Sequence, residues 1–171
     1  MLVPPQPSEF NPYYKGYIDK VKDEDLMGCL EGQKQSFRTL VEEWPKDKLD
    51  YKYAEDKWTV KEVLTHINDI ERIFAYRLVT VLRGEKKSIP GFDENEYIRN
   101  ANINHRIIEN FITEFSALRN SSIALCKSVQ ESDWTRAGNF NGSSMSARAI
   151  AYMMPGHVAH HLDILNERYR S

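Results

Sequence analysis

Apolar residues recur at steps of three and four positions in four long stretches of this chain, with polar residues between them. That spacing is typical of amphipathic helices. It predicts helices over residues 23–43, 59–83, 93–130 and 143–169, and the polar run at 100–104 can interrupt the third. No stretch shows a convincing strand alternation. The expected fold class is therefore all-α, a four-helix bundle.

The expected helix boundaries rest on residues that cap or stop helices. Thr59 followed by Glu62 matches a capping box, and Gly84 marks the end of the same helix. Ser143 or Ser144 is expected to cap the last helix, because a serine hydroxyl can accept a hydrogen bond from a free backbone N–H.

The first residues follow a different pattern. Residues 1–17 are rich in proline and tyrosine, which predicts an N-terminal arm rather than a helix. We expect its tyrosines to pack on the rest of the protein, which would form one domain over residues 18–171. The chain start shows no basic segment followed by an apolar one, so no signal peptide is expected. No run is long and apolar enough to span a bilayer.

The composition is that of an ordinary globular protein, with 171 residues, 41% apolar and 28% charged, and a formal net charge of −2. This charge gives no reason to expect binding to nucleic acid or to an anionic membrane surface. Cys29 and Cys126 fall inside helical patterns, which favours small buried hydrophobes over a disulfide. A reducing, cytoplasmic location is therefore expected.

Three of the five histidines, His157, His160 and His161, lie within five positions on an apolar helical stripe. A buried imidazole without a partner costs roughly 1–3 kcal/mol, and a metal ion can satisfy several at once. His157 and His161 are four residues apart near the middle of the stripe. They are favoured over His157 with His160, which lies at its flank. The alternative is that all three are ordinary packed or solvated histidines.

His66 lies at the edge of the apolar stripe of the second expected helix. By itself it would be interpreted as structural, but a flanking histidine can turn toward a neighbouring helix. Helix bundles build metal sites from side chains on facing helices. His66 with His157 and His161 would make a three-histidine site. His105 is isolated among polar residues and is expected at the surface.

Catalytic and binding side chains are harder to assign. His160 is the first candidate for a general base, because an imidazole can titrate near neutral pH. The alternative is a surface histidine or one that supports the site. Glu71 and Asp163 are weaker candidates, since both fit solvated helix charges. Arg77 is a candidate for binding a carboxylate of a cofactor or substrate, or else forms an ordinary ion pair.

Several motifs of this chain occur together in a known family. The segments are NPYY at 11–14, KWTVKEVLTH at 57–66, DIERIFAYR at 69–77, PGFD at 90–93 and GHVAHHL at 156–162. Their order and spacing resemble the DinB/YfiT-like superfamily of metal-dependent proteins, and the similarity covers nearly the whole chain. The resemblance implies an up-down-down-up bundle, often a homodimer, with a divalent metal held by three histidines. By position these are His66, His157 and His161.

The resemblance also has consequences for activity. Family members with an assigned role include thiol-dependent transferases and isomerases that use bacillithiol, mycothiol or glutathione. This chain departs from the family at two positions. Pro155 stands where relatives more often have a small helix former, and it predicts a kink or a helix that restarts at the histidines. Val158 often corresponds to an acidic residue, so an acid–base contribution from that position would be missing.

Three neutral imidazoles leave a divalent metal with open positions, as in catalytic rather than closed structural zinc sites. Zinc, nickel, manganese and iron(II) all suit such ligands. No cysteine of the chain lies in a motif suited to attack, so a thiol would come from a low-molecular-weight cofactor. The expected function is a metal-dependent enzyme acting on a small molecule. A thiol-dependent S-transferase or related detoxification activity is favoured over a hydrolase.

Other functional classes fit less well. A zincin protease needs a glutamate directly after its first histidine, where this chain has Val158. A non-catalytic, stress-associated bundle that binds a metal or a small ligand is the main alternative, because no general base is assured. A metal-free bundle acting through its surface or a dimer interface is the third reading.

Overall fold

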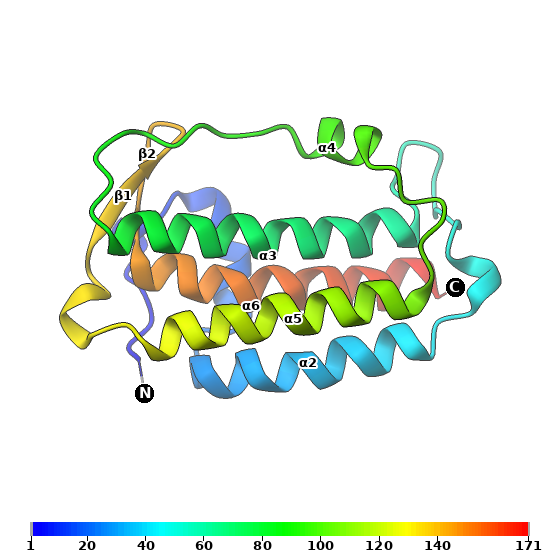
Figure 1. Ribbon diagram of the computed structural model, residues 1–171, viewed down its shortest axis with the longest axis horizontal. Coiled ribbons are helices and arrows are strands. Elements are labelled where there is room, and N and C mark those ends of the chain that lie inside the picture. The colour runs from blue at the N-terminus through cyan, green and yellow to red at the C-terminus, as the bar shows by residue number, and fades with distance from the viewer. Residues whose placement is uncertain (1, 171) are drawn as a thin grey trace.

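Four long helices build the fold, as the apolar spacing predicts (Figure 1). In the computed structural model, which describes residues 2–170, they are α2 (Leu26–Glu42), α3 (Val60–Leu82), α5 (Ile108–Lys127) and α6 (Ala147–Ile164). Helices α3 and α5 run in one direction, and α2 and α6 run in the other. The expected all-α, up-down-down-up bundle is therefore confirmed.

Side chains from all four long helices fill the interior. Helix α2 packs on α5 and α6, and α3 packs on the same two helices. Buried apolar residues form two clusters, one around Phe74 and Ile150 and the other around Phe37 and Phe115, whose rings stack with centroids 4.1 Å apart. Within residues 2–170, no helix is both long enough and apolar enough to cross a membrane.

A long crossover joins the parallel helices α3 and α5 along the outside of the bundle (Figure 1). It contains the short helix α4 (Glu94–Asn100), which begins where the Asp93 carboxylate accepts backbone N–H groups. The single helix expected over 93–130 is therefore two helices, and the predicted break lies between them. This crossover also carries Phe92 and Glu94 to the side of α3.

A two-stranded hairpin replaces part of an expected loop. Strand β1 (Ala137–Phe140) pairs antiparallel with β2 (Ser143–Ser146). The turn residues Asn141 and Gly142 have φ angles of 51° and 79°, and Asn-Gly is the favoured sequence for a two-residue hairpin turn. The expectation that this chain has no strands is wrong, and the Asn-Gly pair was the available signal.

Helix α6 begins later than expected. The predicted cap at Ser143 or Ser144 is wrong because both residues belong to β2. The hydroxyl of Ser146 caps the helix instead, accepting the N–H of Ala149 at 3.1 Å.

Helix α6 also continues through Pro155 without interruption, so the predicted restart is wrong. Every side chain from Ala149 to Val158 is buried, and this packing offsets the hydrogen bond that a proline removes from a helix. A side chain of α2 also bonds to α6 at this proline: Gln33 donates its Nε2–H to the Pro155 carbonyl at 2.7 Å.

The N-terminal segment contains short helical turns where no helix is expected. These are η1 (Pro7–Glu9), η2 (Pro12–Tyr14) and α1 (Lys15–Asp19), and α1 packs on α6. The close approach depends on Gly156, since a Cβ atom there would lie 2.2 Å from the Tyr17 carbonyl oxygen. The division into an arm at 1–17 and a domain at 18–171 stays a prediction.

Candidate metal centre

Helix α3 places His66 less than two turns from its N-terminus. The predicted capping box is present: the Thr59 N–H donates to Glu62 Oε2 at 2.6 Å, and the Glu62 N–H donates to Thr59 Oγ1 at 3.3 Å. This box fixes where α3 begins and therefore which residues face the interior. His66 is 4% exposed, and the ring of Trp58 lies 4.8 Å from its imidazole.

Helix α6 supplies two more imidazoles from adjacent turns. The ring centroids of His157 and His161 lie 4.4 Å apart, and each lies 4.9 Å from the ring centroid of His66. One nitrogen from each of the three rings falls within 4.8 Å of the others. The favoured pairing of His157 with His161 across from His66 thus matches the arrangement of the side chains. Their role as metal ligands stays a prediction.

The electrostatic environment keeps these three imidazoles neutral. Burial lowers the pKa of His66 to about 4. Burial also lowers the pKa values of His157 and His161 well below the ordinary value, and the neighbouring imidazoles lower them further. A neutral imidazole has one bare nitrogen, which is the form that binds a metal.

The hydrogen bonding around the three rings suits a metal ion. Nε2 of His66 and Nε2 of His157 lie 3.0 Å apart, and the buried Nδ1 of His161 has no hydrogen-bond partner. In residues 2–170, none of the three rings bonds to a carboxylate or a backbone carbonyl. Metal–nitrogen bonds of about 2.1 Å bring ligand nitrogens within about 4.2 Å of each other, so small side-chain movements suffice. The donor set therefore fits a divalent ion with open positions.

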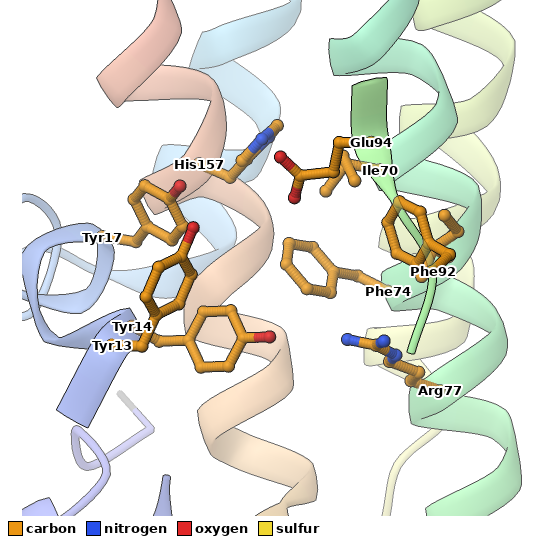
Figure 2. A pocket seen from close by; sticks show the side chains of 10 residues that line it. Tyr13, Tyr14, Tyr17, Ile70, Phe74, Arg77, Phe92, Glu94 and His157 are labelled. Atoms are coloured by element: carbon orange, nitrogen blue, oxygen red, sulfur yellow. The ribbon is translucent and has the colours of Figure 1, made fainter. Parts of the chain in front are cut away.

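One side of the centre opens into a cavity lined by His157, which we call the His157 cavity. It is narrow, with a free volume of about 30 Å³, and it opens to solvent. Aromatic residues from three segments line it, and Figure 2 shows Tyr17 on one side, Phe74 in the middle and Phe92 on the other. Its charged side chains are Glu94 and Arg77.

The other side of the centre opens into a separate cavity lined by His161, which we call the His161 cavity. Trp58 and Tyr169 form part of its wall, and the Tyr169 hydroxyl donates to the Trp58 carbonyl at 2.7 Å. Lys57 and Asn95 lie at the same cavity. Two of the three imidazoles are thus accessible from different directions.

Two further sequence candidates, His160 and Asp163, lie on α6 beside the centre. His160 is half-buried at the flank, as expected, with its ring 5.1 Å from Tyr17 and 5.0 Å from His161. Its assignment as general base stays a prediction. Asp163 is an exposed helix charge paired with Lys20 at 2.6 Å.

Glu71 differs from the solvated charge that the sequence suggested. It is 2% exposed, and its carboxylate accepts two hydrogen bonds from Arg119, at 2.9 and 3.0 Å. The reading of Glu71 as a solvated charge is therefore wrong. Val158 is also buried, within the apolar cluster around Phe37.

Two side chains at the centre were missed by the sequence analysis. Tyr17 packs edge-on against His157 with centroids 5.4 Å apart. The carboxylate of Glu94 is directed into the His157 cavity (Figure 2), and desolvation together with Asp93 raises its pKa. No periodic pattern marks either residue, because both reach the site through tertiary packing of non-helical or short helical segments. The nearest signals were the motifs that precede them, since Tyr17 lies three residues after NPYY and Glu94 directly follows PGFD.

Comparison with known proteins supports this picture of the fold. The solved structure of YfiT from Bacillus subtilis, described as a probable metal-dependent hydrolase with an unusual four-helix bundle topology, superposes with a TM-score of 0.74. The alignment covers 97% of this chain and 91% of that one, at 19% sequence identity. No curated protein matches the chain. The model of the DinB superfamily matches residues 30–165, most of the chain, and this protein therefore belongs to the DinB superfamily.

Proposed function

We propose that this protein is a divalent-metal-dependent enzyme that transfers a small thiol to an electrophilic substrate. The observation that carries the proposal is the position of the three imidazoles between two cavities. The His157 cavity and the His161 cavity reach the centre from different sides. A transferase must hold two substrates together at one centre, and two separate openings allow this.

His66, His157 and His161 would hold the ion, and when bound it would supply a Lewis acid that lowers the pKa of a coordinating thiol or water. Neither cysteine of the chain supplies a thiolate. Burial raises the pKa of Cys29 to about 11 and that of Cys126 to about 12, so both thiols stay protonated. The thiol must therefore come from a small molecule.

Glu94 is the proposed proton acceptor of the transfer. Its carboxylate enters the His157 cavity, and its raised pKa favours holding a proton taken from the thiol. The thiol sulfur then forms a bond to the electrophilic carbon, and the leaving group departs with the electron pair of its former bond. The aromatic side chains around His157 limit the space for water near this step.

Hydrolysis is the second candidate, and Glu94 is the observation that favours it. A carboxylate with a raised pKa beside an open three-histidine centre could equally accept a proton from water. The two candidates differ in the nucleophile and share the same residues.

Elemental analysis of the untagged protein beside His66→Ala and His157→Ala tests the shared site. We expect near-stoichiometric divalent metal in the wild type and its loss in both variants. His105→Ala is the matched control, because His105 is exposed and away from the centre. Absence of metal from the wild type after reloading and desalting would rule out the proposal.

The loaded protein is then incubated with an aryl halide and with cysteine, glutathione or bacillithiol in turn. Metal-dependent thioether formation above the uncatalysed rate is the result expected of a transferase. Release of the halide without consumption of thiol would instead identify the hydrolase. Turnover that is identical in His157→Ala would contradict both.

A further inference from the structure

Arg77 is a buried cation, and no carboxylate of residues 2–170 forms a hydrogen bond or an ion pair with it. Its side chain is 5% exposed, its Nε atom is buried without a hydrogen-bond partner, and no ion pair within residues 2–170 involves it. The guanidinium lies against two aromatic rings, with Cζ 5.3 Å from the centroid of Phe140 and 6.0 Å from that of Phe92. The alternative for this residue, an ordinary helix ion pair, is not formed with any residue that the structure describes.

The other well-buried arginine of the fold shows how unusual this is. Arg119 is fully buried and makes two hydrogen bonds to Glu71 and a third to Gln33. A buried charge is costly unless it is paired. The rings beside Arg77 stabilise its charge only in part, since a cation–π contact contributes far less than desolvation of a cation costs.

The surroundings of Arg77 indicate which kind of chemical group would pair with its guanidinium. Figure 2 shows its guanidinium directed into the His157 cavity, with the side chain of Phe74 between it and His157. The other charged side chain that lines this cavity is Glu94. The charge of Arg77 lowers the pKa of Glu94, but the two side chains do not approach closely enough to form a salt bridge. One unpaired guanidinium balances one negative charge, and its planar fork matches the geometry of a carboxylate.

We propose that Arg77 forms a carboxylate-binding subsite, so that the substrate entering the His157 cavity is an elongated apolar or aromatic carboxylate. The subsite itself follows from the unpaired guanidinium, whereas the role of its ligand as substrate rests on the proposed function. Arg77 lies eleven residues beyond His66, which is about 16 Å along the helix axis. A ligand that reaches both must therefore extend past Phe74, where the walls favour an apolar body.

Binding of 3-phenylpropionate tests this subsite, with its neutral amide as the matched ligand. Both are titrated by NMR into the full-length protein, metal-free and zinc-loaded, for the wild type, Arg77→Met and Arg77→Lys. We expect the wild type to prefer the carboxylate roughly 10- to 100-fold, as a charge-assisted hydrogen bond would give. The preference should vanish in Arg77→Met and be partly kept in Arg77→Lys. Arg83→Met, an exposed arginine on the same helix end, should behave as the wild type.

Several outcomes would overturn the subsite. These are equal affinity for the two ligands in the wild type, an unchanged preference in Arg77→Met, and no saturable binding of the carboxylate. A preference that depends on zinc but not on Arg77 would place the carboxylate at the histidines instead. The metal content of the same samples is measured separately, so loss of the metal site and loss of the carboxylate subsite are distinguishable. Arg77→Lys keeps the test valid if Arg77→Met fails to fold.

Discussion

Helix α3 contributes to two buried polar clusters that differ in how completely their polar groups are paired. In the first, Glu71 pairs with Arg119 through two hydrogen bonds, and Arg119 donates a third to Gln33 at 2.8 Å. Gln33 then donates to the Pro155 carbonyl. This chain of contacts ties α3, α5, α2 and α6 together with each charge neutralised.

The second cluster joins His66 of the same helix to His157 and His161 of α6, and its three side chains are also buried. Its three rings have no carboxylate or carbonyl partner in the described part of the chain, and one ring nitrogen has no partner of any kind. A satisfied buried network stabilises a fold, whereas an unsatisfied one carries a cost that a ligand can remove. The difference favours a structural role for Glu71 and supports the proposed role of the histidines as metal ligands.

Removing Glu71 should produce the largest effect of all. Glu71→Ala leaves the charge of Arg119 buried and unpaired, which costs about 3–5 kcal/mol in the free energy of unfolding. Urea denaturation of the metal-free protein measures the loss. Glu31→Ala, which removes an exposed partner of Lys127, is the matched control and should leave the free energy of unfolding nearly unchanged, because water screens this pair. A small loss in Glu71→Ala would show that this network does not stabilise the bundle.

The histidine cluster should make the metal-free protein sensitive to acid. Burial lowers the pKa of His66 to about 4 in the folded protein, whereas an unfolded histidine titrates near 6.5. The unfolded chain thus takes up a proton between these pH values and the folded chain does not. The free energy of unfolding is therefore unaffected above about pH 6.5 and falls as the pH approaches 4, by about 3 kcal/mol for this group.

Urea denaturation in the presence of a chelator, at about pH 7.5 and about pH 4.5, measures this sensitivity. His66→Gln should lose less stability between the two pH values than the wild type, because glutamine has no proton to gain. His105→Gln should lose as much as the wild type, since His105 is exposed. Equal losses in His66→Gln and the wild type would show that His66 is not buried as a neutral group.

Features that depend on nearby residues were predicted from the sequence, whereas features that depend on other parts of the fold were not. Helical periodicity located the four long helices, and the Thr59 capping box was correct because both partners lie within one turn. The hairpin escaped detection because its strands have only four residues each, too few to show an alternation. The predicted start of α6 was therefore wrong as well, because the residue that caps α6 depends on where β2 ends.

The residues of the candidate site also differ in how far the sequence predicts their surroundings. The spacing of His157 and His161 pointed to one face of a helix, and His66 joined them only through the expectation that two helices face each other. Glu71 was misread because its partner Arg119 is far away in sequence, on another helix. Glu94 and the unpaired state of Arg77 depend on the path of the crossover, which no local pattern specifies.

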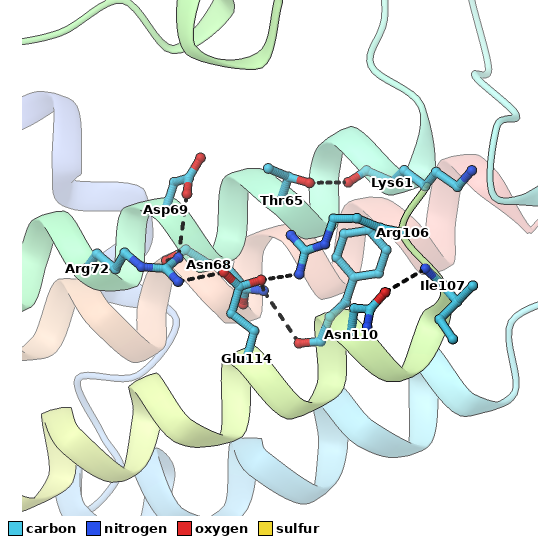
Figure 3. A network of polar contacts seen from close by, with 10 residues as sticks. Lys61, Thr65, Asn68, Asp69, Arg72, Arg106, Ile107, Asn110 and Glu114 are labelled. Atoms are coloured by element: carbon cyan, nitrogen blue, oxygen red, sulfur yellow. Dashed lines mark hydrogen bonds and ion pairs between the residues drawn. The ribbon is translucent and has the colours of Figure 1, made fainter. Parts of the chain in front are cut away.

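The smallest predicted effect concerns a third polar cluster, which lies between α3 and α5 and is partly exposed (Figure 3). Glu114 accepts hydrogen bonds from Asn68 at 2.9 Å and from Arg72 at 2.5 Å, and it also contacts Arg106. Arg72 is 46% exposed, so water screens its charge and can replace its contact. Arg72→Ala should therefore lower the free energy of unfolding by less than about 1 kcal/mol, because Glu114 keeps its other partners.

Urea denaturation of Arg72→Ala and Glu71→Ala side by side tests this difference directly, since both variants remove one member of an Arg–Glu pair formed between α3 and α5. Similar losses in the two variants would mean that burial does not set the difference between these clusters.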